Sequence, residues 1–142
     1  MLKILFINNP EYLKAEDVIW FDVPQNKEKE DLISSLEIGL NFLVGGTNWD
    51  SLDENLRTAE WTSKKKVVLS HHFLPKLNEK DLKTYLCLLN EDSLIVDRDN
   101  KELPFSEENV GNILKANPKW ALIVIFPKNL KEKISTFLAK NN

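Results

Sequence analysis

The chain has 142 residues, of which 42% are hydrophobic and 29% are charged, and its formal net charge is −3. This composition predicts one globular domain, long enough to bury a core without help from a disulfide or a metal ion. The acidic balance argues against nucleic acid as a direct ligand, and the single cysteine, Cys87, excludes an internal disulfide and suggests a reducing compartment.

The N-terminal part of the chain alternates between β-like and helix-like segments. Residues 2–7 form an apolar run, interrupted by Lys3, that is too short for a signal-peptide core or a membrane span. We therefore expect a cytoplasmic protein without membrane contact. Val18–Val23 is almost continuously apolar, which is typical of a strand covered on both faces. Asn26 can cap a first helix. The apolar side of that helix carries Leu32, Ile33, Leu36, Leu40 and Leu43.

A short acidic helix is predicted after the paired glycines Gly45 and Gly46. Only glycine enters positive φ without penalty, so the pair predicts a break in the chain, and Thr47 or Asn48 can cap the helix that follows. The apolar face of this helix consists of Trp49, Leu52 and Leu56. The opposite face consists of Asp50, Asp53, Glu54 and Arg57.

The acidity of the chain is concentrated around this helix. Residues 50–60, including Glu60, carry a net charge of −3, which equals the net charge of the whole chain. The simplest interpretation is a solvated helix face. The sharper interpretation is a docking surface for a basic partner.

A third strand is predicted over residues 67–73, after the run Lys64-Lys65-Lys66. The lysines indicate a solvated strand entrance rather than a phosphate site, because no further basic or aromatic residues cluster nearby. Adjacent side chains in a strand point to opposite faces, so His71 and His72 cannot share a metal ion, and no carboxylate or cysteine is spaced to complete a site. We predict neither a bound metal nor a cofactor.

The C-terminal half repeats the alternation of helix and strand. Asn78 can cap a helix that contains Cys87, and residues 93–105 predict a small hairpin inserted on the core. A helix opened by Ser106 and closed by Asn117-Pro118 precedes Trp120–Phe126, which is the strongest strand signal in the chain. A last amphipathic helix carries Leu130, Ile134, Phe137 and Leu138.

Strands separated by helices predict parallel crossover connections. The expected fold class is α/β, a small parallel sheet packed with helices. Its three core strands are Val18–Val23, residues 67–70 and Trp120–Phe126, and residues 2–7 extend one edge.

Binding is the function class that the sequence favours over catalysis. The chain contains no G-x-G-x-x-G, G-x-x-x-x-G-K-[ST], G-x-S-x-G or H-E-x-x-H motif. Asp50 and Glu54 share a helix face, but a short exposed helix lacks the cleft that separates the pKa values of a catalytic pair. Carboxylates clustered on a rigid helix can instead imitate RNA phosphates in a ribonuclease site, which is rich in basic groups.

The segment that begins this helix resembles a known motif. Gly46-Thr47-Asn48-Trp49-Asp50-Ser51-Leu52, followed by Leu56, is similar to the G-x-N-[LW]-D-[AS]-L-x-x-x-L core of the barstar family, whose members are intracellular inhibitors of secreted ribonucleases. The dense match covers residues 36–56, and a looser one follows the order of elements from Trp20 to Phe126. The resemblance implies a single barstar-like domain over residues 1–142. Residues 1–10, residues 93–105 and the helix after Pro127 are additions to the family core.

The resemblance also implies a binding site and a partner. Family members reach into a ribonuclease with the loop before the motif and the helix that it begins. Carried over by position, the expected toxin-binding residues are Val44, Gly46, Asn48, Asp50, Asp53, Glu54 and Arg57. Glu54 stands where the family has its central aspartate, and Asp50 matches an acidic contact residue.

Two positions depart from the family, because Val44 replaces a contact tyrosine and Asp53 replaces a contact tryptophan. Aromatic anchors often carry interface energy, so these departures put the identity of the target ribonuclease in question.

The expected function is therefore that of an immunity protein for a ribonuclease toxin, without nucleic acid as partner and with no oligomeric state specified by the sequence. One alternative is an inhibitor of another toxin class, such as a DNase. The other is a small enzyme with its site at the carboxyl ends of the strands, near His71 and His72. A deep pocket that holds both histidines would favour the enzyme.

Overall fold

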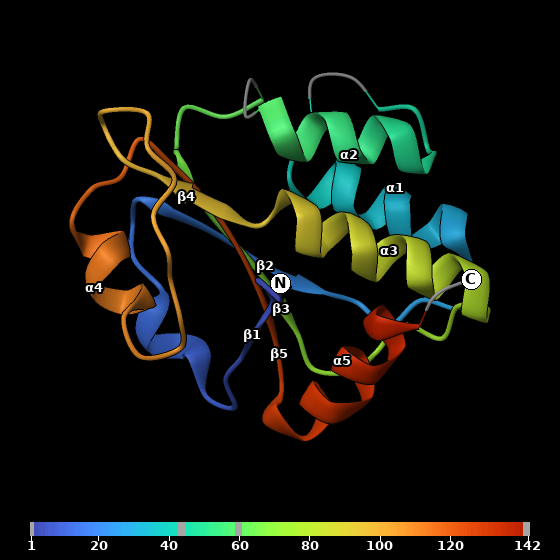
Figure 1. Cartoon of the computed structure of the whole chain (residues 1–142). Coiled ribbons are helices and arrows are strands. Elements are labelled where there is room, and N and C mark those ends of the chain that lie inside the picture. Colours follow the sequence, from blue (N-terminus) through green and yellow to red (C-terminus); the bar gives the residue numbers. More distant parts are fainter. Residues whose placement is uncertain (1, 43–44, 59–60, 141–142) are drawn as a thin grey trace.

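A five-stranded sheet forms the centre of the computed structural model, which describes residues 2–42, 45–58 and 61–140 (Figure 1). The strands are β1 (Leu5–Phe6), β2 (Val18–Val23), β3 (Lys66–His71), β4 (Leu94–Val96) and β5 (Trp120–Phe126). Their order is β1-β5-β3-β2, with every pair on this path parallel, and β4 pairs antiparallel with β5. The predicted α/β class, a parallel sheet packed with helices, is confirmed, and the arrangement is compatible with a barstar-like architecture.

Helices cover the two faces of the sheet unequally. On one face lie α1 (Lys29–Gly39), α2 (Trp49–Thr58), α3 (Glu79–Asp92) and α5 (Lys131–Ala139), the last entered through the 3₁₀ turn η2 (Lys128–Leu130). On the other face lie the 3₁₀ turn η1 (Pro10–Leu13) and the short α4 (Val110–Lys115) (Figure 1). All seven residues of β5 are buried, because alternate side chains enter the two cores. This explains why β5 is the strongest strand signal in the sequence.

The two short strands share one edge of β5. Leu5 and Phe6 of β1 lie opposite Ile125 and Phe126, while β4 lies opposite residues 120–122. The predicted N-terminal edge strand is therefore present, although it is shorter than residues 2–7. The predicted hairpin is present too, because the Leu103 amide donates to the Ile95 carbonyl at 2.8 Å and Val96 bridges Glu102.

Some predicted element ends differ from the structure. Asn26 does not cap α1; its side-chain amide donates to Ser35 Oγ, and Glu28 precedes the helix without a side-chain cap. Leu43, predicted in the same helix, lies outside the described residues, as does Glu60 beyond α2. Asn78 does cap α3, and its Oδ1 accepts from the Asp81 amide at 2.8 Å.

The lysine run before β3 is only partly solvated. Lys64 and Lys65 are exposed, but Lys66 is the first residue of β3, is 6% exposed, and holds Asp17 through an Nζ–Oδ2 contact of 2.6 Å. The predicted solvated start of the strand is therefore correct for Lys64 and Lys65 and wrong for Lys66, which is buried and ion-paired. Among the described residues, no helix is long and apolar enough to cross a membrane.

Candidate functional site

The loop that leads into α2 is held by a carboxylate from α1. Glu37 Oε2 accepts hydrogen bonds from the Gly46 amide at 2.7 Å and from the Thr47 amide at 3.2 Å. These two backbone donors fix the entry of α2 to the last turn of α1. Glu37 was not predicted as part of the site, because it lies nine residues before Gly46 in the sequence and only the fold brings it to the loop.

The paired glycines serve close packing rather than positive φ, which corrects the prediction. All four glycines of the chain lie in the described ranges and none has a positive φ; among the described residues between α1 and α2, the left-handed ones are Asn41, at φ 59°, and Thr47, at φ 53°. A Cβ on Gly46 would lie 2.7 Å from Ser51 Oγ, and one on Gly45 would lie 3.0 Å from the Glu37 carboxylate. A larger residue at position 46 would therefore force Ser51 to shift, and one at position 45 would press on the carboxylate that holds the loop.

Asn48 caps α2, as predicted. Its Oδ1 accepts from the Ser51 amide at 2.8 Å, and its side-chain amide donates to the Gly46 carbonyl at 3.1 Å. Ser51 Oγ completes the turn by donating to the Asn48 carbonyl. The cap satisfies one of the free amides of the first turn and stabilises a helix of this kind by about 1 kcal/mol.

The apolar side of α2 packs on the core. Leu52 and Leu56 are fully buried, while Trp49 is half-buried and stacks at a tilt on Tyr85 of α3, with 5.9 Å between ring centroids. The Trp49 indole nitrogen is buried and has no hydrogen-bond partner among the described residues. The three residues thus form the predicted apolar face, and α2 is fixed to the domain along its length.

The charged side chains of α2 divide into two groups. Asp50 and Glu54 are exposed. Asp53 is partly buried, and its Oδ2 lies 3.1 Å from Arg57 Nε. The free negative charge of the helix is therefore carried by Asp50 and Glu54, while Asp53 and Arg57 largely neutralise each other. Val44, the remaining expected contact, lies outside the described residues.

Asp92 adds a buried carboxyl group beside this surface. It ends α3, is 3% exposed, and its Oδ2 has no hydrogen-bond partner among the described residues. Burial, reinforced by a hydrogen bond to Asp53 and by that residue's charge, raises the pKa of Asp92 to about 8, against a partial opposing effect of Arg57. One feature of the sequence indicated that Asp92 would be buried. Asp92 follows Leu88 and Leu89 at helical spacing and so lies on the apolar side of α3.

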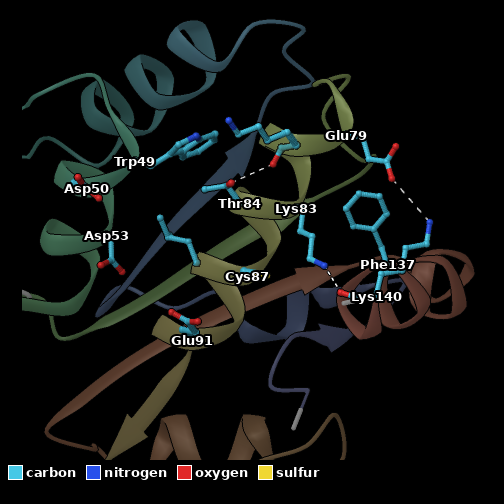
Figure 2. Close-up of a pocket in the computed structure, with 12 residues that line it drawn as sticks. Trp49, Asp50, Asp53, Glu79, Lys83, Thr84, Cys87, Glu91, Phe137 and Lys140 are labelled. Carbon is cyan, nitrogen blue, oxygen red and sulfur yellow. Dashed lines mark hydrogen bonds and ion pairs between the residues drawn. The ribbon is translucent and has the colours of Figure 1, made fainter. Parts of the chain in front are cut away.

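A groove of about 670 Å³ runs beside α2 (Figure 2). Its floor is the outer face of α3, one wall is α2 and the other is α5. The side chains that line it are Trp49, Asp50, Asp53, Glu79, Lys80, Lys83, Thr84, Cys87, Leu88, Glu91, Phe137 and Lys140. The groove thus begins at the same face of α2 that carries Asp50 and Asp53.

The two histidines lie in different environments. His72 is exposed, and its Nε2 lies 3.6 Å from Asp22 Oδ1. His71 is 3% exposed, stacks on Phe126 with 4.0 Å between ring centroids, and contacts the Ile125 carbonyl and the Tyr85 hydroxyl through its two ring nitrogens. The two imidazoles therefore do not share a pocket.

The tautomer of His71 follows from its partners. A carbonyl oxygen can only accept, so Nδ1 donates to Ile125 at 3.1 Å. Burial lowers the pKa of His71 to about 3, so the ring is neutral and Nε2 accepts from the Tyr85 hydroxyl at 2.7 Å. Both nitrogens are occupied inside the core, which is the arrangement of a structural histidine.

Within the described ranges, no group of three or more His, Cys, Asp and Glu side chains could hold a metal ion. No protein-family model matches the chain, and comparisons with curated proteins and with solved structures returned no match. The chemistry of the site therefore has to be argued from its own residues.

Proposed function

We propose that the chain is an intracellular inhibitor of the barstar type, an immunity protein that binds a ribonuclease toxin and blocks its active site with α2. The observation that carries the proposal is the exposed carboxylate pair of Asp50 and Glu54, mounted on a helix whose other side is buried. Both charges stand on the first two turns of α2, one turn apart, so they project from the same face.

The rigid attachment of α2 to the domain supports a role of this helix in inhibition, rather than its being only a solvated surface. The N-terminus of α2 is capped by Asn48 and tied to α1 through Glu37, and its apolar side packs on Tyr85 and the core. Because the backbone of α2 is already ordered, binding through its carboxylates costs little further backbone freedom. A ribonuclease presents arginine, lysine and histidine to its substrate, and these groups can donate charge-assisted hydrogen bonds to Asp50 and Glu54.

The position of Asp53 is consistent with a changed partner. In this chain the residue is an ion-paired carboxylate at the border of the groove, not an exposed aromatic anchor. An inhibitor with this surface depends on charge and on groove contacts where an aromatic anchor is absent. The target is therefore a ribonuclease different from those that bind through a tryptophan at this position.

Co-expression in bacteria tests the proposal. The chain is produced together with each member of a panel of secreted ribonuclease toxin domains, with DNase toxin domains as a second panel. We expect protection against at least one ribonuclease, and loss of protection for the double variant Asp50→Asn with Glu54→Gln.

The matched control is Glu108→Gln, which removes an exposed carboxylate before α4, on the other face of the sheet. If the double variant protects cells as well as wild type at low and high toxin doses, α2 does not form the binding surface. If the chain protects cells against a DNase toxin and against no ribonuclease, its target belongs to the DNase class instead.

A further inference from the structure

The groove beside α2 is electrically polarised along its length. Along α2 and towards the C-terminal end of α3, its charged side chains are the carboxylates of Asp50, Asp53 and Glu91. At the N-terminal end of α3 they are three lysines against one glutamate: Lys80 and Lys83 from the first two turns of α3 and Lys140 from the end of α5, against Glu79. The groove therefore has a negative end and a positive end rather than the uniform sign of a plain acidic surface.

The dipole of α3 reinforces this polarity. Glu79 and Lys80 lie in the first turn of the helix and Glu91 lies in its last turn. The N-terminus of a helix carries partial positive charge and the C-terminus partial negative charge. The backbone thus adds to the field of the lysines at one end and to that of the carboxylates at the other.

The basic end of the groove is built across two helices. The Lys83 ammonium donates to the Lys140 carbonyl, and Lys140 Nζ lies 4.0 Å from Glu79 Oε1 and 5.5 Å from the centre of the Phe137 ring. These contacts hold the C-terminal end of α5 against the start of α3, so the wall formed by α5 is part of the folded domain.

The middle of the groove is uncharged. Thr84, Cys87 and Leu88 form the floor there, and Trp49 and Phe137 face it from the two walls. The lining residues of α3 run from position 79 to position 91, which is about 18 Å of helix. An extended segment covers this distance in about five or six residues.

From this pattern we infer that the groove is a second contact surface for the toxin, and that it takes a toxin segment with a basic side chain beside Asp53 and Glu91, an apolar side chain over Cys87 and Leu88, and a carboxylate at the N-terminal end of α3. This inference rests on the proposed function, because the groove continues the surface of α2. The groove makes one prediction about the toxin that the acidic helix alone does not make. The toxin should carry an acidic group on an otherwise basic binding surface.

Cys87 offers a direct test, because it is the single cysteine of the chain and lies half-buried in the middle of the groove. The probe is the ribonuclease domain recovered by co-expression, inactivated in its catalytic residues. The rate of Cys87 alkylation by iodoacetamide is measured with and without this domain. At a hundredfold excess over the dissociation constant, a covered thiol reacts about a hundredfold more slowly. The control is Cys87→Ser with Glu108→Cys, whose thiol should stay reactive.

Charge reversal gives a second, independent measurement. Lys80→Glu should raise the dissociation constant about fivefold, because it replaces an attraction for the carboxylate of the toxin with repulsion. Lys115→Glu, an exposed reversal on α4, should leave the constant unchanged.

The outcomes separate this inference from the proposed function. If no ribonuclease binds, the proposed function fails and the groove has no partner. If a ribonuclease binds and the Asp50 and Glu54 variants weaken it, but Cys87 stays reactive and Lys80→Glu binds like wild type, the groove inference alone is overturned. Protection of Cys87 together with weaker binding of Lys80→Glu supports it.

Discussion

The carboxyl group of Asp92 makes the stability of the protein depend on pH. Its pKa is about 8 in the folded chain against a usual 3.8, because burial and the neighbouring Asp53 disfavour its charge. The unfolded chain therefore loses this proton near pH 4 and the folded chain keeps it to about pH 8. The stabilisation of the fold by the protonated Asp92 carboxyl is therefore fully present below pH 4 and is lost as the pH rises to about 8.

The variant Asp92→Asn tests this linkage. In wild type the free energy of unfolding should fall across pH 4–8 by up to about 1.4 kcal/mol per pH unit from this group alone. The neutral amide should remove that slope, so the variant gains stability relative to wild type towards alkaline pH. Urea unfolding at several pH values measures the difference. A constant difference between the two proteins from pH 5 to pH 9 would show that Asp92 is ionised in the fold.

The buried pair of His71 and Tyr85 is predicted to be structural. Tyr85→Phe removes the hydroxyl that His71 Nε2 accepts from and leaves a buried nitrogen without its partner. We expect a loss of about 1–3 kcal/mol in the free energy of unfolding, with toxin binding retained once the protein is folded. The exposed Tyr12→Phe is the control, with an expected change near zero. Equal stability of the two variants would mean that the hydrogen bond contributes nothing.

At the scale of elements, the loop between α1 and α2 depends on a single side chain from outside it. Glu37→Ala deprives the Gly46 and Thr47 amides of their acceptor. Hydrogen exchange measured by NMR should become faster at these two amides, while the Ser51 amide, held by Asn48, keeps its protection. Unchanged exchange at residues 46 and 47 would show that Glu37 does not hold the loop in solution.

Local patterns sufficed to predict the elements that carry strong periodicity or a cap. β2, β5, α3 and the apolar side of α2 were all predictable, because continuous apolar runs, helical periodicity and the caps at Asn48 and Asn78 are properties of neighbouring residues. The turn η1 was not predicted, since Pro10 signals the end of a strand as readily as the start of a 3₁₀ turn.

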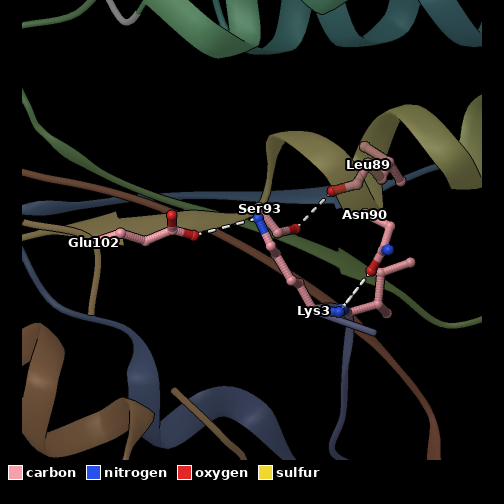
Figure 3. A network of polar contacts seen from close by, with 6 residues as sticks. Lys3, Leu89, Asn90, Ser93 and Glu102 are labelled. Carbon is pink, nitrogen blue, oxygen red and sulfur yellow. Dashed lines mark hydrogen bonds and ion pairs between the residues drawn. The ribbon is translucent and has the colours of Figure 1, made fainter. Parts of the chain in front are cut away.

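Features made by distant residues escaped prediction. The contact of Glu37 with the loop before α2, the interaction of Asp53 with Asp92 and the groove each involve residues from different elements of the fold. The N-terminus provides a further case, because the Asn90 side chain accepts from the Lys3 amide at 2.6 Å and Lys3 Nζ lies 3.3 Å from Glu102 (Figure 3). These contacts place β1 beside the end of α3 and the hairpin, which no local pattern specifies.

At the scale of the whole molecule, the charge distribution predicts how fast the protein meets its target. α2 carries Asp50, Asp53 and Glu54 against Arg57, a net charge of −2 in a chain of net charge −3, so we expect the attraction for a basic partner to be centred on this helix. The association rate constant should fall steeply as ionic strength rises from 0.05 to 0.5 M. The Asp50→Asn, Glu54→Gln variant should be slower at low salt and less salt-dependent, as measured by stopped-flow fluorescence. Parallel salt dependences for the variant and wild type would place the steering charge elsewhere.

The most direct test of the account is a hydrogen-exchange footprint of the chain bound to the inactivated ribonuclease. We predict slower exchange in the complex over residues 45–57, with β2 and α4 unchanged. Slower exchange confined to β2 or α4, with α2 as in the free protein, would contradict the claim that the acidic helix is what occupies the active site of the ribonuclease.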